Sequence, residues 1–119
     1  MDVQKSLLKV EKTLKDAREY WRTEKHMCAL YDAQVEGVAQ AKLDLGKAAR
    51  MGIDTNLFMR SQLQAMSSGL WLQDQACFER MISRRIGYKA AFDAIDRTIA
   101  RERRENDRVH DRGSQERYL

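Results

Sequence analysis

The sequence predicts an all-α protein in which two long helices form an antiparallel coiled-coil hairpin. The 119 residues contain no proline and six glycines, and 34% of them are charged. Apolar residues recur every three or four positions along the first half of the chain, and few runs typical of strands occur. Long helices and coiled coils have this composition, and the length suffices for a single domain, expected over residues 1–119.

The first helix is expected from about Val3 to Arg50. Positions alternately four and three residues apart, from Val3 to Ala49, are all apolar except Glu24 and Lys42. A repeat of about 3.5 residues kept over this length is the pattern of a coiled-coil seam, which needs a partner helix. Residues 33–49 are rich in alanine and glycine, so this half is expected to approach its partner most closely.

The hairpin turn is expected at residues 51–54. Gly52 suits the left-handed position that ends a helix, and Asp54 suits the N-cap of the next one. A connection this short makes its two helices antiparallel neighbours. In that register four pairs of seam residues face one another: Val10 with Ile95, Leu14 with Ala91, Cys28 with Cys77, and Val35 with Leu70.

The second helix is expected from about Thr55 to Arg112, with a polar tail at residues 113–119. Its weak point is the stretch Ser67–Gly69, where helix-breaking residues follow one another. Ser68 could cap a separate helix that begins at Leu70. That alternative has three helices instead of two.

Groups that support catalysis are scarce in this chain. The two histidines, His26 and His110, lie far apart in sequence, and no glycine-rich phosphate loop follows a strand. We therefore expect no enzyme, no cofactor, no metal and no small-molecule substrate. The chain shows no apolar stretch long enough to span a membrane and no secretory signal, and its two cysteines suit a reducing compartment. These features predict a cytoplasmic protein.

A second apolar stripe follows the second helix beside the row that faces the seam. Its members are Trp71, Phe78, Ile82 and Ile86. A two-helix hairpin covers only one stripe per helix, so this one would be exposed and could bind another protein. The alternative is that it closes a dimer or packs against a third helix.

Basic residues concentrate near the two chain ends, which the hairpin register brings together. Arginines alternate with acidic residues after Ile99, beside the lysines of the first helix. A solvated helix end is one interpretation, and an arginine-rich probe for an acidic protein surface is the other. Nucleic acid fits less well, because the interleaved acids weaken the positive field that phosphates need.

Two stretches carry a resemblance to a known family. MGIDTNLFMRSQLQAM looks like the turn and second-helix start of flagellar export proteins, and ERRENDRVHDRGSQER is similar to their polar C-terminus. Together with the predicted hairpin, they resemble the stalk proteins of type III secretion and flagellar export, the FliJ and YscO type.

This resemblance implies a stalk that couples a hexameric secretion ATPase to an export gate, at the cytoplasmic face of the inner membrane. Trp71, Phe78 and Ile82 would then contact the gate or a chaperone. The basic residues that would meet the ATPase ring are Lys5, Lys9, Lys12, Arg101, Arg104 and Arg108. The alternatives are a secretion chaperone, a homodimeric helical adaptor and, less favoured, a nucleic-acid-binding accessory protein.

Overall fold

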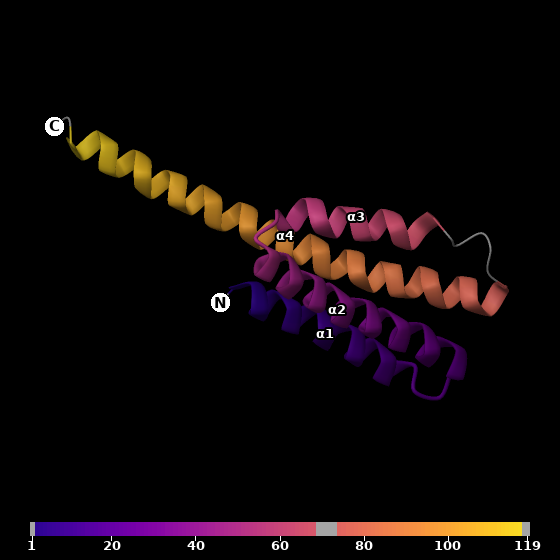
Figure 1. Ribbon diagram of the computed structural model, residues 1–119. Helices are drawn as coiled ribbons and strands as arrows, with labels where there is room; N and C mark the ends of the chain where they lie inside the picture. Colours follow the sequence, from indigo (N-terminus) through magenta and orange to yellow (C-terminus); the bar gives the residue numbers. More distant parts are fainter. Residues whose placement is uncertain (1, 69–73, 118–119) are drawn as a thin grey trace.

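The computed structural model describes residues 2–68 and 74–117, which form four helices (Figure 1). They are α1 (Asp2–Tyr20), α2 (Lys25–Met51), α3 (Thr55–Ser68) and α4 (Gln75–Arg117). α2 and α4 form the central pair, and α1 and α3 each pack against both of them. The all-α prediction is confirmed, whereas the described residues form a four-helix arrangement and not the expected two-helix hairpin.

The helix expected from Val3 to Arg50 is divided into α1 and α2 at residues 21–24. The chain reverses there without glycine or proline, and Glu24 takes an extended conformation with φ −106° and ψ 100°. α1 then folds back along α2, where the Arg18 guanidinium forms a 2.5 Å ion pair with Asp32. The apolar period continues through this turn, so periodicity alone could not reveal it.

The turn between α2 and α3 has the chemistry expected from the sequence. Gly52 ends α2 in the left-handed region with φ 66°, and its N–H bonds to the Ala49 carbonyl oxygen at 3.2 Å. The Asp54 carboxylate then accepts a 3.0 Å hydrogen bond from the N–H of Leu57 and caps α3. This connection makes α2 and α3 antiparallel.

The helix expected from Thr55 to Arg112 is also divided, close to its predicted weak point. α3 ends at Ser68 and α4 begins at Gln75, capped by Asp74, which accepts a 2.9 Å bond from the N–H of Cys77. That bond lowers the pKa of Asp74. Leu70, the alternative start, lies outside the described residues. α4 continues to Arg117, so residues 113–117 are helical and not part of a tail.

The central pair is parallel, not antiparallel as a hairpin requires. His26 of α2 lies 3.4 Å from Glu79 of α4, and farther along both helices Asp44 lies 2.6 Å from Tyr88. Gly37 of α2 packs against the backbone of α4, where an added Cβ would lie 1.9 Å from the Arg84 carbonyl oxygen. Gly87 packs in the same way against α2, 1.9 Å from the Gln34 carbonyl oxygen. The two glycines therefore place the helix backbones in direct contact. The antiparallel register holds between α1 and α4, where the hydroxyls of Ser6 and Thr98 lie 3.1 Å apart.

The core forms where the flanking helices meet this pair. Its buried members are Leu7, Leu14, Val38, Ala41, Met59, Leu63, Tyr88, Ala91, Phe92 and Ile95. Seam residues of the predicted first helix thus contribute to the core from both α1 and α2, with Leu7, Leu14 and Val38 buried. Lys42, a polar interruption of that seam, forms an ion pair with Glu11 of α1.

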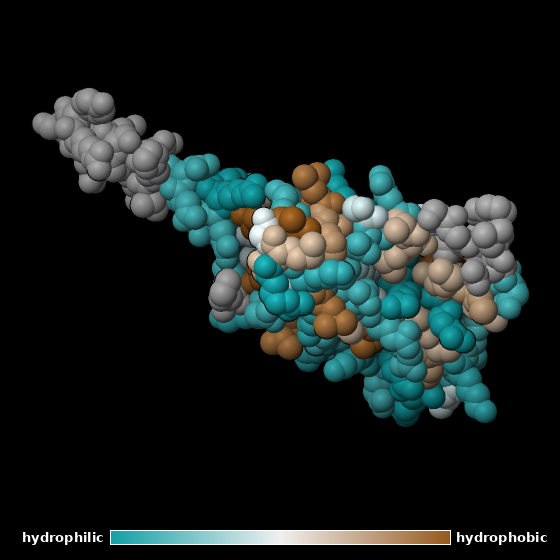
Figure 2. All heavy atoms as spheres, in the orientation of Figure 1, coloured by the Kyte–Doolittle hydropathy of each residue, from teal (hydrophilic) through white to brown (hydrophobic). Residues whose placement is uncertain are grey.

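α4 extends past the other helices, and its described surface there is hydrophilic (Figures 1 and 2). The extension begins at the end of the bundle that also holds the start of α1 and the α2–α3 turn. Among the described residues, no helix is both long and apolar enough to cross a membrane.

A polar contact between α2 and α4 lies inside the core. The hydroxyl of Tyr88, a fully buried residue, donates a 2.6 Å hydrogen bond to the Asp44 carboxylate. Burial, and then the bond and the negative charge of Asp44, raise the pKa of Tyr88 above its ordinary value of 10.0. The tyrosine therefore stays a neutral donor over the physiological pH range.

We expect Gly37→Ala to destabilise the protein by about 2 to 3 kcal/mol, because the new methyl group forces the central helices apart. Gly46→Ala is the matched control, since its Cβ would meet only the flexible Arg50 side chain at 3.4 Å. The control should be neutral or stabilising by up to about 1 kcal/mol. Urea unfolding measures the change in the free energy of unfolding for each variant. An equal change in Gly37→Ala and Gly46→Ala would contradict the backbone contact at Gly37.

Tyr88 should make the protein sensitive to alkali. Because its pKa is raised on folding, its contribution is fully present below the ordinary pKa of 10.0 and is lost as pH rises above it. We expect an additional loss approaching about 1.4 kcal/mol per pH unit in the wild type. Tyr88→Phe should lack this additional slope. Denaturant titrations below and above pH 10 measure the free energy of unfolding of both proteins. If it fell equally with pH in the wild type and in Tyr88→Phe, the role given to Tyr88 would be contradicted.

Candidate functional site

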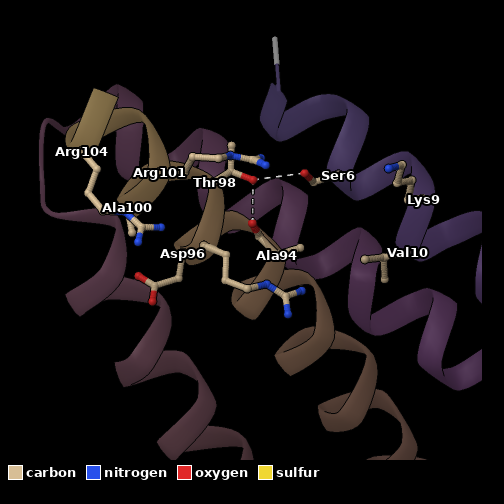
Figure 3. Close-up of a pocket in the computed structure, with 10 residues that line it drawn as sticks. Ser6, Lys9, Val10, Ala94, Asp96, Thr98, Ala100, Arg101 and Arg104 are labelled. Carbon is tan, nitrogen blue, oxygen red and sulfur yellow. Dashed lines mark hydrogen bonds between the residues drawn. The ribbon is translucent and has the colours of Figure 1, made fainter. Parts of the chain in front are cut away.

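An open groove follows the line where α1 meets α4 (Figure 3). Its largest hollow, about 560 Å³, surrounds the contact between Ser6 and Thr98. The hollow continues along α1 toward Leu14 in one direction and toward Asp2 in the other. We call this surface the basic groove, for the cations described below.

The floor of the basic groove is made of small or apolar side chains. α1 contributes Val10 and Leu14, and α4 contributes Ala90, Ala94 and Thr98. The hydroxyl of Thr98 donates to the Ala94 carbonyl oxygen at 2.9 Å and lies 3.1 Å from the Ser6 hydroxyl. The floor is thus mainly apolar, and the buried Thr98 hydroxyl already has its hydrogen-bond partners within the protein.

Five cations line the groove: Lys5 and Lys9 from α1, and Arg97, Arg101 and Arg104 from α4. Spacings of three and four residues place each set on one helix face. In Figure 3, Arg101 extends from α4 toward Ser6 on α1.

None of these five cations forms a hydrogen bond or an ion pair within the protein, as the side-chain contacts of the described region show. Some cations elsewhere are engaged: Arg18 binds Asp32, and Lys89 binds Asp93 at 3.0 Å. These five cations are therefore available to bind groups of a partner.

Acidic side chains also border the groove, but two of them are engaged. Asp93 binds Lys89, and Asp96 accepts a 2.6 Å hydrogen bond from the Asn56 amide of α3. Asp2 and Glu105 lie at the end where α4 leaves the bundle. Cations outnumber carboxylates in the largest hollow, where Asp96 is the one acidic residue, and the two signs are mixed at the end of the groove.

The structure brings together Lys5, Lys9, Arg101 and Arg104 of the predicted basic set. Lys12 does not line the groove and lies 3.9 Å from Asp16, and Arg108 is exposed on the extension of α4. The prediction omitted Arg97, although its position four residues before Arg101 places it on the same face. Whether these side chains bind a partner stays a prediction.

The predicted apolar stripe is only partly accessible. Phe78 and Ile82 are half-buried in the bundle, and Ile86 is 50% exposed. Trp71 lies outside the described residues. A different apolar patch, missed in the sequence, surrounds the α2–α3 turn: Met51, Ile53 and Leu57 are 59%, 41% and 69% exposed.

This apolar patch lies at the same end as the basic groove. Ile53 and Leu57 share a hollow with Ile99 and Arg103 of α4. The base of the α4 extension is therefore flanked by the basic groove on its α1 side and by exposed apolar residues on its α3 side. Charged and apolar surfaces meet there.

Comparison with protein-family models, curated proteins and solved structures finds no match to the chain. Among the described residues, no three His, Cys, Asp or Glu side chains gather where they could hold a metal ion. Function is therefore inferred from the surfaces themselves.

The unpaired cations should contribute little to folding. We expect Lys9→Gln and Arg101→Gln to leave the free energy of unfolding within about 0.5 kcal/mol of the wild type, because no internal partner is lost. At low salt the stability should rise slightly as repulsion falls. Arg18→Gln, which breaks the exposed ion pair with Asp32, is the comparison and should cost up to about 1 kcal/mol. A clear loss in either groove variant would reveal an internal role.

Proposed function

We propose that the protein is a non-enzymatic helical adaptor that binds an acidic protein segment in the basic groove. The single observation that carries this proposal is the set of five unpaired cations around an apolar floor. Cations that stabilise no internal contact are available for charge-assisted bonds to carboxylates of a partner. The apolar floor adds a place for the partner's apolar side chains.

A protein segment fits this groove better than nucleic acid does. Asp2, Asp93, Asp96 and Glu105 border it, and their charges would repel a continuous row of phosphates. A peptide can place its carboxylates selectively beside Lys9, Arg97 and Arg101. The apolar floor is also unlike a phosphate-binding surface, which is polar.

The shape of the groove favours an amphipathic helix as the occupant. It follows α1 from Asp2 to Leu14, which corresponds to a helical length of about 18 Å, or roughly three turns. A helix of that length could face the floor with an apolar stripe and direct acidic side chains to both rims. This is the helix-in-groove mode of recognition.

A hexameric secretion ATPase is a specific candidate partner, from the resemblance to export stalk proteins. The extension of α4 supports this form of the proposal, because a projecting helix flanked by cations could enter an acidic ring. The adaptor would then couple the ATPase to an export gate at the cytoplasmic face of the inner membrane. This partner would be supported if one copy of the protein co-eluted with each ATPase hexamer. The variant in which the lysines and arginines of the groove are replaced by glutamine should lose that co-elution.

A secretion chaperone or homodimeric adaptor is the second candidate. The exposed residues around the α2–α3 turn and Ile86 favour it, because they offer apolar surface to another chain. Light scattering coupled to size exclusion separates the two. A stable dimer that buries these residues would favour this second candidate over the adaptor that acts as a monomer.

The direct test uses a synthetic three-turn amphipathic helical peptide with glutamates flanking an apolar stripe. We expect it to perturb backbone NMR signals along α1 and α4, with an affinity that falls as salt increases. The variant Lys5→Gln, Lys9→Gln, Arg101→Gln, Arg104→Gln should lose most of this affinity.

The matched control changes the same number of exposed cations elsewhere: Lys15→Gln, Lys25→Gln, Arg60→Gln and Arg80→Gln. It alters net charge equally and should retain most of the binding. Equal loss in both variants would mean that the peptide responds only to overall charge. Signals confined to other surfaces would reject the groove.

A further inference from the structure

A second hollow, of about 210 Å³, lies where α2, α3 and α4 meet. Its lining includes Asp44, which is 6% exposed and is the one buried carboxylate among the described residues. Met66 and Met81 contribute thioether side chains, and the Gln62 amide there forms no hydrogen bond. Arg84 brings a solvent-exposed guanidinium to the same hollow.

Neutral donors hold both oxygens of the Asp44 carboxylate. The Tyr88 hydroxyl donates to one oxygen at 2.6 Å, and the Gln40 amide nitrogen donates to the other at 3.0 Å. Arg84 reaches this network only through the Gln40 amide oxygen, at 3.4 Å. The buried negative charge therefore has no direct cationic partner, an arrangement that favours a ligand cation.

We infer that this hollow binds a small zwitterion, an α-amino acid with an apolar side chain. Its ammonium group would bind Asp44, its carboxylate would bind Arg84, and its side chain would lie against Met66 and Met81. This inference does not depend on the basic groove.

The side-chain amide of Gln40 shows why a zwitterion fits. It presents a donor to Asp44 and an acceptor to Arg84 on two atoms bonded to the same carbon. The headgroup of an α-amino acid presents the same donor and acceptor in the same order, with full charges. Charge-assisted bonds are stronger than those of a neutral amide, so the ligand can displace Gln40 from between the two groups.

Simpler ligands match the hollow less well. A plain amine would satisfy Asp44 but leave its charge beside Arg84, and a plain carboxylate would meet Asp44 without a counter-charge. The volume of 210 Å³ lies below the range of about 300 to 1,000 Å³ that holds drug-sized molecules. A single amino acid is therefore a suitable size.

The test is a titration of the full chain, labelled with ¹³C at the methionine methyl groups, with L-leucine. The methyl signals of Met66 and Met81 should shift together and saturate. Met59, which is fully buried in the core, and the exposed Met51 are internal references that should not move. The matched probes are 4-methylpentanoate, which lacks the ammonium group, and 3-methylbutylamine, which lacks the carboxylate. Both should bind at least tenfold more weakly.

Variants separate binding from folding. Asp44→Asn and Arg84→Gln should each weaken L-leucine binding about tenfold, the effect of losing one charge-assisted bond. Gln40→Ala should tighten it several-fold, because the displaced amide is gone. Asp16→Asn, on the exposed face of α1, is the control that leaves binding unchanged.

Arg84→Gln and Gln40→Ala alter accessible side chains, so they keep the test decisive if Asp44→Asn fails to fold. Absence of methyl shifts with millimolar L-leucine would overturn the inference. Equal binding of the amine would overturn the zwitterion assignment, and weaker binding by Gln40→Ala would overturn the displacement of Gln40.

Discussion

The architecture depends on the backbone contact between α2 and α4 at Gly37 and Gly87. Because neither position has a side chain, the two helices approach until backbone atoms touch. The contacts of His26 with Glu79 and of Asp44 with Tyr88 show that the two helices of this pair run in parallel. Chain connectivity then determines the rest. α1 is joined to α2 through residues 21–24, and α3 follows α2 through the turn at Gly52, so both flanking helices run antiparallel to the pair and pack against it. The basic groove exists because α1 lies against α4 in this arrangement.

The sequence predicted many of the residues that pack together, but not the relative direction of the helices that carry them. Most apolar residues of the seam from Val3 to Ala49 are buried or partly buried, although Trp21 and Ala49 are exposed. The small residues of α2 correctly indicated close approach at Gly37. The reversal at residues 21–24 was hidden because the seam period passes through it. In α2 the buried face also includes residues off the seam, such as Ala33, Ala41 and Ala48. Periodicity identifies the buried face of a helix, but it does not identify which helix covers that face or in which direction.

The candidate site was predictable to a similar degree. Lys5, Lys9, Arg101 and Arg104 were chosen for charge and position, and they do lie together, because the register between α1 and α4 matches the one expected. Which cations stay unpaired is a property of the tertiary structure. Lys42 is also a lysine of the first half of the chain, yet it forms an ion pair with Glu11 of α1. Lys12 lies beside Asp16 on its own helix. Sequence spacing shows the second pairing but not the first.

The two proposed sites share one physical feature, a charge that folding leaves uncompensated. At the basic groove the imbalance is positive and open to solvent, so long side chains can reach a large partner and salt can weaken the attraction. At Asp44 the imbalance is negative and buried, so only a ligand small enough to enter can correct it, and screening by salt is weak. The same criterion thus assigns a macromolecular partner to one site and a small molecule to the other, because accessibility determines the size of the compensating charge.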